Sequence, residues 1–254
     1  MPIFGYPRPK TLPDIVRTPI QELLAKLQSL LSEKAPKVLD SLEPGLDDAQ
    51  IDEVEKEFGF KLGKGLRALY KWRNGMLPAI EKLDPEKKKA YSEEVRQFYE
   101  EKGFFGVPPG LDKKYGLESG TDSFVPGHTF LPLNKAASAL REVYKDTQEQ
   151  AWFQRFICWF SRHKRNWIHV LDDGAGDGYF YDPGRKEEGG AFFFHFTETG
   201  NYIWFPSLNN FILAVIECYE TGSFYWDEEE NNVVEDFDKA GEIIERYGTL
   251  RENL

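Results

Sequence analysis

A glycine-rich turn in the second half of the chain carries three aspartates close together. It reads Asp172-Asp173-Gly174-Ala175-Gly176-Asp177-Gly178, and carboxylates that converge on a flexible loop are ligands for a hard cation such as Ca²⁺. Counted from Asp173, however, the third position is Ala175 and the twelfth is Gly184. The bidentate carboxylate that closes a calcium loop is therefore missing. We expect a structural hairpin turn here, no metal site and no cofactor.

Two histidines on predicted strands are the candidates for acid–base catalysis. The period of two along a strand places His169 on one face with Trp167, and His195 on one face with Phe193. If these faces coincide, both imidazoles can pair with Asp173 as acid and base. No nucleophile elbow, HExxH motif or CxxC spacing accompanies them. Histidines of a half-buried sheet are more often held by hydrogen bonds, so we expect a protein that is not an enzyme.

Two further short motifs are weaker signals. Gly63-Lys64-Gly65 lacks the preceding strand, the spacing and the Ser or Thr of a phosphate-binding loop. The basic run Arg162-His163-Lys164-Arg165 ends a predicted helix, where cations complement the helix dipole. Neither motif predicts nucleotide or nucleic-acid binding.

The composition limits the class of protein. The chain has 254 residues, 41% of them hydrophobic, with 43 acidic and 32 basic residues and a net charge of −11. Such a chain can bury a large core, and its charge disfavours direct contact with nucleic acid or an anionic membrane while favouring a basic partner. No apolar run approaches the roughly 20 residues that span a bilayer, and no secretory signal is visible. With Cys158 and Cys218 outside any CxxC motif, we expect a cytoplasmic protein.

The N-terminal part of the chain predicts an arm followed by a helix. Residues 1–17 contain four prolines and little periodicity, which favours an arm laid over the domain. Leucines at helical spacing between Leu23 and Leu31 predict a helix that begins with Thr18 as its cap and ends or kinks at Pro36.

A helical pair is predicted next. Asp47, with Gln50 three positions later, has the pattern of a capped helix start, and Gly59 ends that helix. Leu66, Leu69 and Tyr70 mark a shorter second helix that closes at Asn74-Gly75. Residues 76–125 then change character and are interpreted as an insertion containing a solvated helix.

The second half of the chain predicts strands around two helices. A long helix is expected from Lys135 to Phe160, and Ser207 caps a final core helix that ends at Thr221-Gly222. Short aromatic-rich segments bounded by Gly, Asp or Asn predict an antiparallel meander. These four segments are Trp167–Leu171, Gly178–Asp182, Gly190–Phe196 and Asn201–Phe205, and a separate short extended segment, Thr129–Leu133, precedes the long helix.

The C-terminal 33 residues are strongly acidic. Residues 222–254 hold ten acids and three bases and so supply −7 of the net charge of −11. Ile243, Ile244 and Tyr247 predict a helix docked by one apolar edge. A concentrated negative segment suits a basic partner protein. The candidate partner-binding residues are Tyr225, Trp226, Asp227, Glu228, Glu229 and Glu230, with Asp172, Asp173 and Asp177 as a second candidate surface.

Two groups of segments together resemble a known family. The first comprises Leu42-Glu43-Pro44-Gly45-Leu46, Ile51, Glu55, Phe58-Gly59, Leu66-Arg67-Ala68-Leu69-Tyr70 and Asn74-Gly75. The second comprises Trp167-Ile168-His169-Val170, the Asp172 to Asp177 turn, Tyr181-Asp182-Pro183 and the helix after Ser207. In order and spacing these segments are similar to the SUKH superfamily, which includes yeast cell-wall assembly regulators and bacterial toxin-immunity proteins. One departure is Gly63, where the family usually shows a proline.

The resemblance implies an α+β domain with a curved, mostly antiparallel sheet flanked by helices, which acts by binding other proteins. On this basis we expect an N-terminal arm and helix at 1–38, a SUKH-like domain at 39–222 with the insertion at about 76–125, and an acidic extension at 223–254 packed on the domain. The leading hypothesis is an immunity protein that neutralises a cognate toxin, commonly a nuclease. The alternatives are a regulatory scaffold for cell-wall assembly or signalling proteins, and an enzyme using His169, His195 and Asp173.

Overall fold

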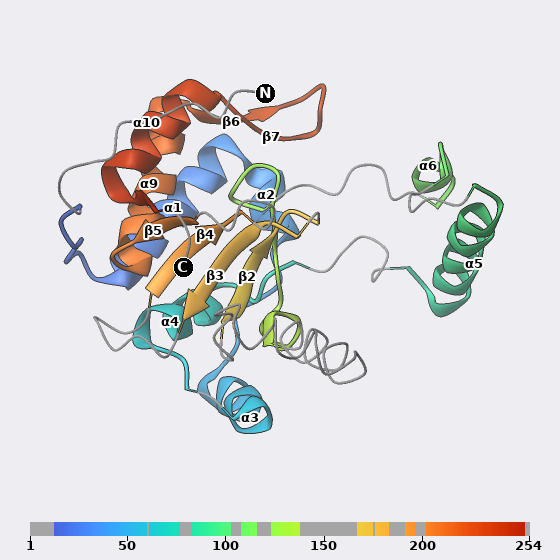
Figure 1. Ribbon diagram of the computed structural model, residues 1–254, viewed down its shortest axis with the longest axis horizontal. Coiled ribbons are helices and arrows are strands. Elements are labelled where there is room, and N and C mark those ends of the chain that lie inside the picture. The colour runs from blue at the N-terminus through green and yellow to red at the C-terminus, as the bar shows by residue number, and fades with distance from the viewer. Residues whose placement is uncertain are drawn as a thin grey trace, which may run out of the picture.

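A six-stranded antiparallel sheet is the central element of the computed structural model (Figure 1). The structure describes residues 13–59, 61–76, 83–102, 108–115, 123–137, 167–174, 176–182, 191–196 and 202–251. The strands pair in the order β1 (Thr129–Phe130), β2 (Ile168–Asp172), β3 (Gly178–Asp182), β4 (Ala191–His195), β5 (Tyr202–Phe205) and β8 (Thr249–Arg251). The predicted meander is confirmed as β2 to β5, and the fold class is α+β.

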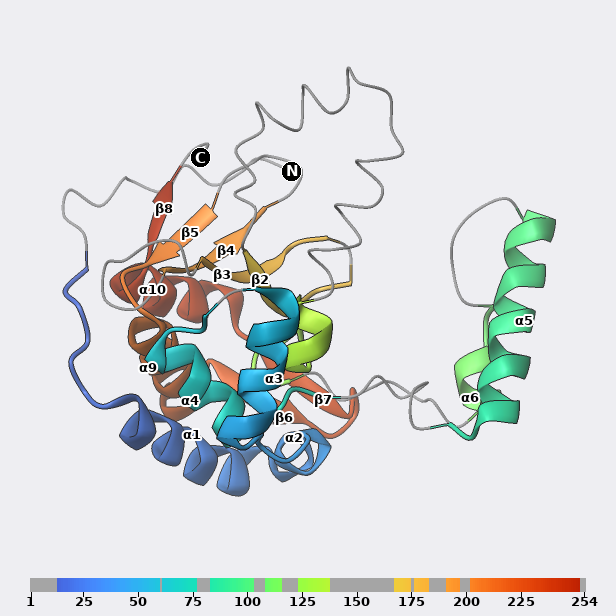
Figure 2. The same cartoon turned by 90° about the horizontal axis from the view of Figure 1, so that it is seen from below.

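Helices cover one face of this sheet. Helix α9 (Leu208–Thr221) packs on it, and the Phe211 ring lies 4.8 Å from Tyr179 and 4.5 Å from Phe192, measured between centroids. Helix α1 (Ile20–Lys34) packs against α9, and Figure 2 shows both helices on the same side of the sheet. Because strand side chains alternate, the other face carries a second apolar cluster. Its members are Trp167, Phe193, Trp204 and the partly buried Phe180.

The predicted capping signals at two helices are confirmed. Asp47 and Gln50 form a reciprocal capping box at the start of α3 (Asp48–Phe58), and Gly59 ends it with a left-handed φ of 73°. Ser207 accepts a hydrogen bond from the Asn210 amide at the start of α9. These signals depend on residues three or four positions apart, so they act before distant contacts form.

The predicted cap at Thr18 is wrong. Helix α1 has Pro19 at its N-cap position and no side-chain cap hydrogen bond. The segment before it is held from α9: Asn209 donates to the Thr18 carbonyl at 2.7 Å, and Asn210 accepts from the Val16 amide at 3.1 Å. A contact almost 200 positions away in sequence therefore replaces the local cap.

The second helix of the pair ends earlier than predicted. Helix α4 (Lys64–Trp72) stops two residues before Asn74, and Arg73 is extended and forms a bridge with Pro44. The Asn74 side chain accepts from the Leu133 amide at 3.0 Å. Gly75 is left-handed as expected, with φ of 74°, but it lies outside the helix. A Cβ at this position would lie 2.3 Å from the backbone nitrogen of Pro132, so only glycine fits the close approach of the two segments.

Gly63 connects the helical pair to the sheet. Its φ of −65° would suit a proline, but its amide donates to the Tyr181 hydroxyl on β3 at 2.9 Å. Proline has no N–H and cannot make this bond. The departure from the family pattern therefore comes with a hydrogen bond between the turn and the sheet.

The acidic extension is folded. Strands β6 (Phe224–Asp227) and β7 (Asn232–Glu235) form an antiparallel hairpin, and α10 (Phe237–Tyr247) follows. Helix α10 packs on α9 with Ile243 buried and with Ile244 and Tyr247 against the core, so the predicted docked helix is confirmed. The sequence did not predict the hairpin or β8.

Other elements lie in or near the predicted insertion. Helices α5 (Pro85–Lys102) and α6 (Leu111–Tyr115) contact each other, with 5.5 Å between the Tyr91 and Tyr115 rings (Figure 1). A solvated helix is thus confirmed. The predicted helix from Lys135 to Phe160 lies outside the described residues beyond Ala137, as do Cys158 and the basic run at 162–165. In the described part of the chain, no helix is both long and apolar enough to cross a membrane.

A buried carboxylate joins α3 to α4. Glu55 is 2% exposed and accepts hydrogen bonds from the Leu62 amide at 2.9 Å and from Arg67 at 3.1 Å. It also pairs with Lys61 at 2.5 Å. Arg67 pairs in addition with the exposed Asp52 at 2.9 Å. A buried charge that keeps all these partners fixes the angle between the two helices.

We predict that Glu55→Ala lowers the free energy of unfolding by about 2–4 kcal/mol, because the Leu62 amide and Arg67 lose a buried acceptor. The matched control is Asp52→Asn, which removes an exposed partner of the same arginine and is expected to change stability by less than about 1 kcal/mol. Urea denaturation measures both. Equal effects of the two substitutions on the free energy of unfolding would contradict the role of Glu55 in joining α3 to α4.

Candidate protein-interaction site

The β6–β7 hairpin separates two kinds of side chain. Cross-strand pairing places Trp226 opposite Val233 and Tyr225 opposite Val234, so the two pairs lie on opposite faces. Val233 is buried and Trp226 is half-buried against the main core. Tyr225 is 46% exposed. Of the two predicted aromatic anchors, Tyr225 is thus the more accessible, and Trp226 attaches the hairpin to the body.

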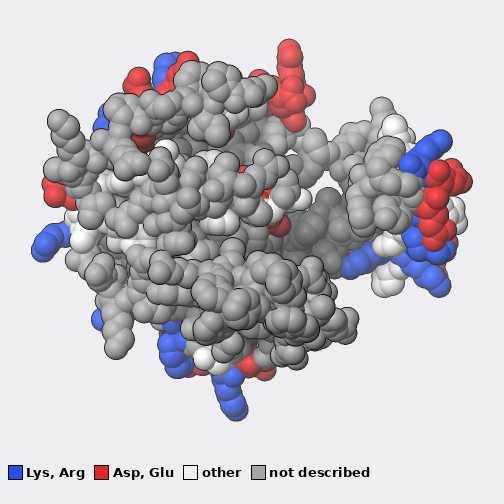
Figure 3. Space-filling view, in the orientation of Figure 1, with Lys and Arg blue, Asp and Glu red and all other residues white. Residues whose placement is uncertain are grey.

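The tip of the hairpin is an ordered, acidic turn. The Asp227 carboxylate accepts from the Glu229 amide at 2.8 Å and from the Glu230 amide at 3.0 Å. Asn231 completes the turn with φ of 50°, a left-handed conformation that asparagine tolerates. Glu228, Glu229 and Glu230 are exposed. In Figure 3, Asp and Glu side chains project where Figure 1 shows the tip of this hairpin.

One lysine contacts three side chains of the hairpin. Lys37, on α2 (Pro36–Ser41), places its ammonium 4.9 Å from the Trp226 ring centroid. The same ammonium lies 3.3 Å from a Glu228 carboxylate oxygen and 2.9 Å from the Asn231 amide oxygen. The Trp226 indole and Lys37 both lower the pKa of Glu228. The tip is therefore tied to α2 while its remaining carboxylates face solvent.

The aspartate turn, the second predicted surface, uses its carboxylates locally. Asp172 accepts from the Gly174 amide at 3.0 Å, and Asp173 accepts from the Gly176 amide at 2.9 Å. The Asp173 amide donates to the Asp177 carbonyl at 3.3 Å, which closes the turn between β2 and β3. Among the residues that the structure describes, no group of three or more His, Cys, Asp and Glu side chains is placed to hold a metal ion.

The two histidines do lie on one face of the sheet. The His169 ring stacks on Phe180 with centroids 4.3 Å apart, and His195 contacts the same ring at 6.1 Å. The Asp172 carboxylate lies 3.8 Å from His169 and also accepts from the Gly174 amide of the turn. Burial lowers the pKa of His169 below its ordinary value. Both imidazoles therefore belong to an aromatic layer on this face of the sheet.

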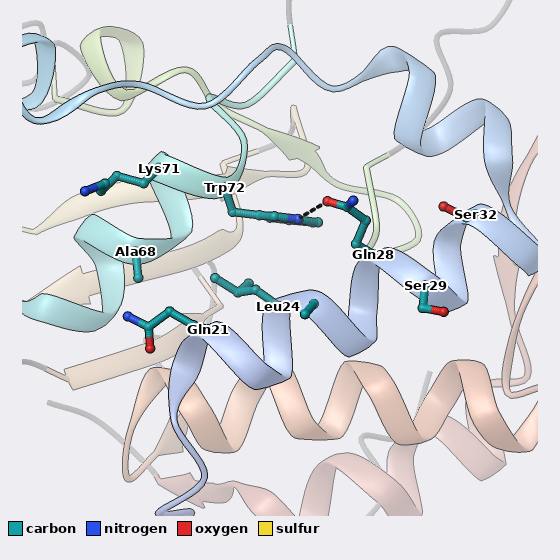
Figure 4. Close-up of a pocket in the computed structure, with 9 residues that line it drawn as sticks. Gln21, Leu24, Gln28, Ser29, Ser32, Ala68, Lys71 and Trp72 are labelled. Carbon is teal, nitrogen blue, oxygen red and sulfur yellow. Dashed lines mark hydrogen bonds between the residues drawn. The ribbon is translucent and has the colours of Figure 1, made fainter.

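An open groove of about 620 Å³ lies between α1 and α4 (Figure 4). Figure 4 shows Trp72 beside Gln28, and the Trp72 indole donates to the Gln28 side-chain oxygen at 2.9 Å. The sequence did not predict this groove, because it requires the contact between α1 and α4. Its lining residues are Gln21, Leu24, Ala25, Gln28, Ser29, Ser32, Ala68, Lys71 and Trp72.

The fold is an α+β domain built around a six-stranded antiparallel sheet. Comparison with family models assigns residues 45–214 to the SMI1 / KNR4 family (SUKH-1). The chain belongs to this family, which confirms the SUKH resemblance. Domains of this family generally bind protein partners. A search of curated proteins finds no match to the chain.

The lowered pKa of His169 predicts a pH-dependent stability. Because the unfolded chain takes up a proton at a higher pH than folded His169, stability contributed by the neutral ring is complete above about pH 7 and is lost as the pH falls below about 6.5. His169→Gln removes this titration. Thermal melts at pH 7.5 and 5.5 should show a smaller pH-dependent loss in the variant than in the wild type. An equal loss in both proteins would contradict this role of His169.

Proposed function

We propose that the chain is a non-enzymatic immunity protein that binds and neutralises a toxin with a basic surface, and that the β6–β7 hairpin makes the contact. The observation that carries this proposal is an exposed aromatic residue on an ordered hairpin with an acidic tip. Tyr225 is 46% exposed, and Glu228 has 76% of its side chain exposed. The family assignment supports a protein-binding role.

The charge distribution explains why such a surface suits a basic partner. A toxin that handles nucleic acid must present positive charge to phosphate groups, and negative charge on an inhibitor steers encounter with that surface. Aromatic side chains such as Tyr225 supply affinity once charges have aligned the two proteins. In this proposal the carboxylates set the association rate and Tyr225 slows dissociation. The Asp172, Asp173 and Asp177 turn is a second contact region.

A regulatory scaffold is the second candidate function. The α5–α6 pair supports it, because α5 is an 18-residue charged helix that packs on α6. A scaffold has use for an additional helical surface of this kind. Genomic context separates the two candidates: an adjacent polymorphic-toxin gene favours immunity, whereas an isolated gene favours a scaffold.

We predict that changing Glu228, Glu229 and Glu230 together to lysine slows association with a toxin that the chain neutralises by about tenfold or more at low salt, because the steering charge is reversed. The matched control changes the exposed Glu33, Glu53 and Glu101 to lysine and alters net charge by the same amount. Stopped-flow association and a toxin-protection assay measure both variants. Unchanged association and protection in the hairpin variant would remove the hairpin from the mechanism.

A further inference from the structure

The hairpin surface already holds a cationic side chain. The Lys37 ammonium lies over the Trp226 ring at 4.9 Å and is hydrogen-bonded to Glu228 at 3.3 Å and to Asn231 at 2.9 Å. An aromatic face, a carboxylate and an amide oxygen are the groups that recognise an ammonium or a guanidinium. We call the Trp226, Glu228 and Asn231 side chains the cation cage.

The contact between Lys37 and the cage can be exchanged. The Lys37 side chain is 51% exposed and that of Glu228 is 76% exposed. Exposed ion pairs contribute little to stability because water and salt compete with them. The cage itself depends less on Lys37, since Trp226 packs against the core and Asp227 holds the turn through backbone amides. Removal of the lysine therefore leaves Trp226 and the backbone of the turn supported.

We propose that the cation cage binds an arginine side chain of the partner protein, and that Lys37 occupies the cage in the free protein and is displaced on binding. This inference rests on the proposed function and names the contact made by the same hairpin. An arginine suits the cage better than a lysine, because its planar guanidinium stacks on an aromatic ring and donates several hydrogen bonds at once.

Removal of Lys37 changes partner binding in opposite directions, depending on whether Lys37 competes with the partner or anchors the hairpin. If Lys37 competes with the partner, only the fraction of molecules with a free cage can bind, so the apparent affinity is reduced by that fraction. Removal of the lysine charge then strengthens binding. If Lys37 only anchors the hairpin for binding, its removal weakens binding. The two roles therefore differ in sign.

The experiment uses the full chain and a fluorescein-labelled nonapeptide of alternating glycine and arginine, with fluorescence anisotropy at low salt. Lys37→Met keeps the aliphatic stem, and we expect about threefold to tenfold tighter binding than in the wild type. The control is Lys26→Met, which removes the same charge and an exposed pair with Glu220 on α9. We expect less than a twofold change in this control. Lys37→Arg should bind the peptide more weakly than the wild type, because arginine fills its own cage better.

Binding by Lys37→Met that is no tighter than by Lys26→Met, or binding by Lys37→Arg that is as tight as by the wild type, would overturn the inference. Circular dichroism and thermal melts establish that each variant is folded. Glu229→Lys combined with Glu230→Lys separates the two proposals. If this pair weakens peptide binding and Lys37→Met does not strengthen it, the cage fails and the acidic surface stands. If neither alters peptide binding, the cage fails, and the toxin-protection assay decides the proposed function.

Discussion

The buried carboxylate of Glu55 is the interaction on which the arrangement of the N-terminal helices depends. It binds the Leu62 amide, and the next residue, Gly63, donates to the Tyr181 hydroxyl on β3. Two consecutive residues, Leu62 and Gly63, therefore link the buried Glu55 carboxylate to the central sheet. On the other side of α4, the Met76 amide donates to the Phe130 carbonyl on β1 at 2.7 Å. The helical pair is thus connected to the sheet at both ends.

The proposed binding surface is positioned by elements from both ends of the chain. Lys34 on α1 donates to the Tyr219 carbonyl at 2.6 Å, at the end of α9, from which the hairpin follows. Lys37, one turn later, reaches the hairpin itself. Lys34 thus contacts the helix that precedes the hairpin, and Lys37 contacts the hairpin tip. In this arrangement the basic residues of α1 and α2 organise the acidic surface, and one of them also occupies its cation cage.

Local patterns made much of the fold predictable, and contacts between distant segments account for the rest. The Asp47 capping box and the aromatic strands β2 to β5 follow from residues near one another in sequence. The sequence does not predict the β6–β7 hairpin, because the run from Asp227 to Glu230 has the composition of a solvated tail. Its turn exists because the Asp227 carboxylate accepts backbone amides. Strand β8 has three residues and depends on pairing with β5, which its own sequence does not indicate.

Hydrogen–deuterium exchange of the chain, with and without a toxin against which it protects cells, measures whether the chain binds through its hairpin surface. If the hairpin makes the contact, we expect slower exchange in residues 224–235 and in α2, and no comparable slowing in the α1–α4 groove. Protection confined to that groove, or to the His169 face of the sheet, with unchanged exchange in the hairpin, would contradict binding through the hairpin.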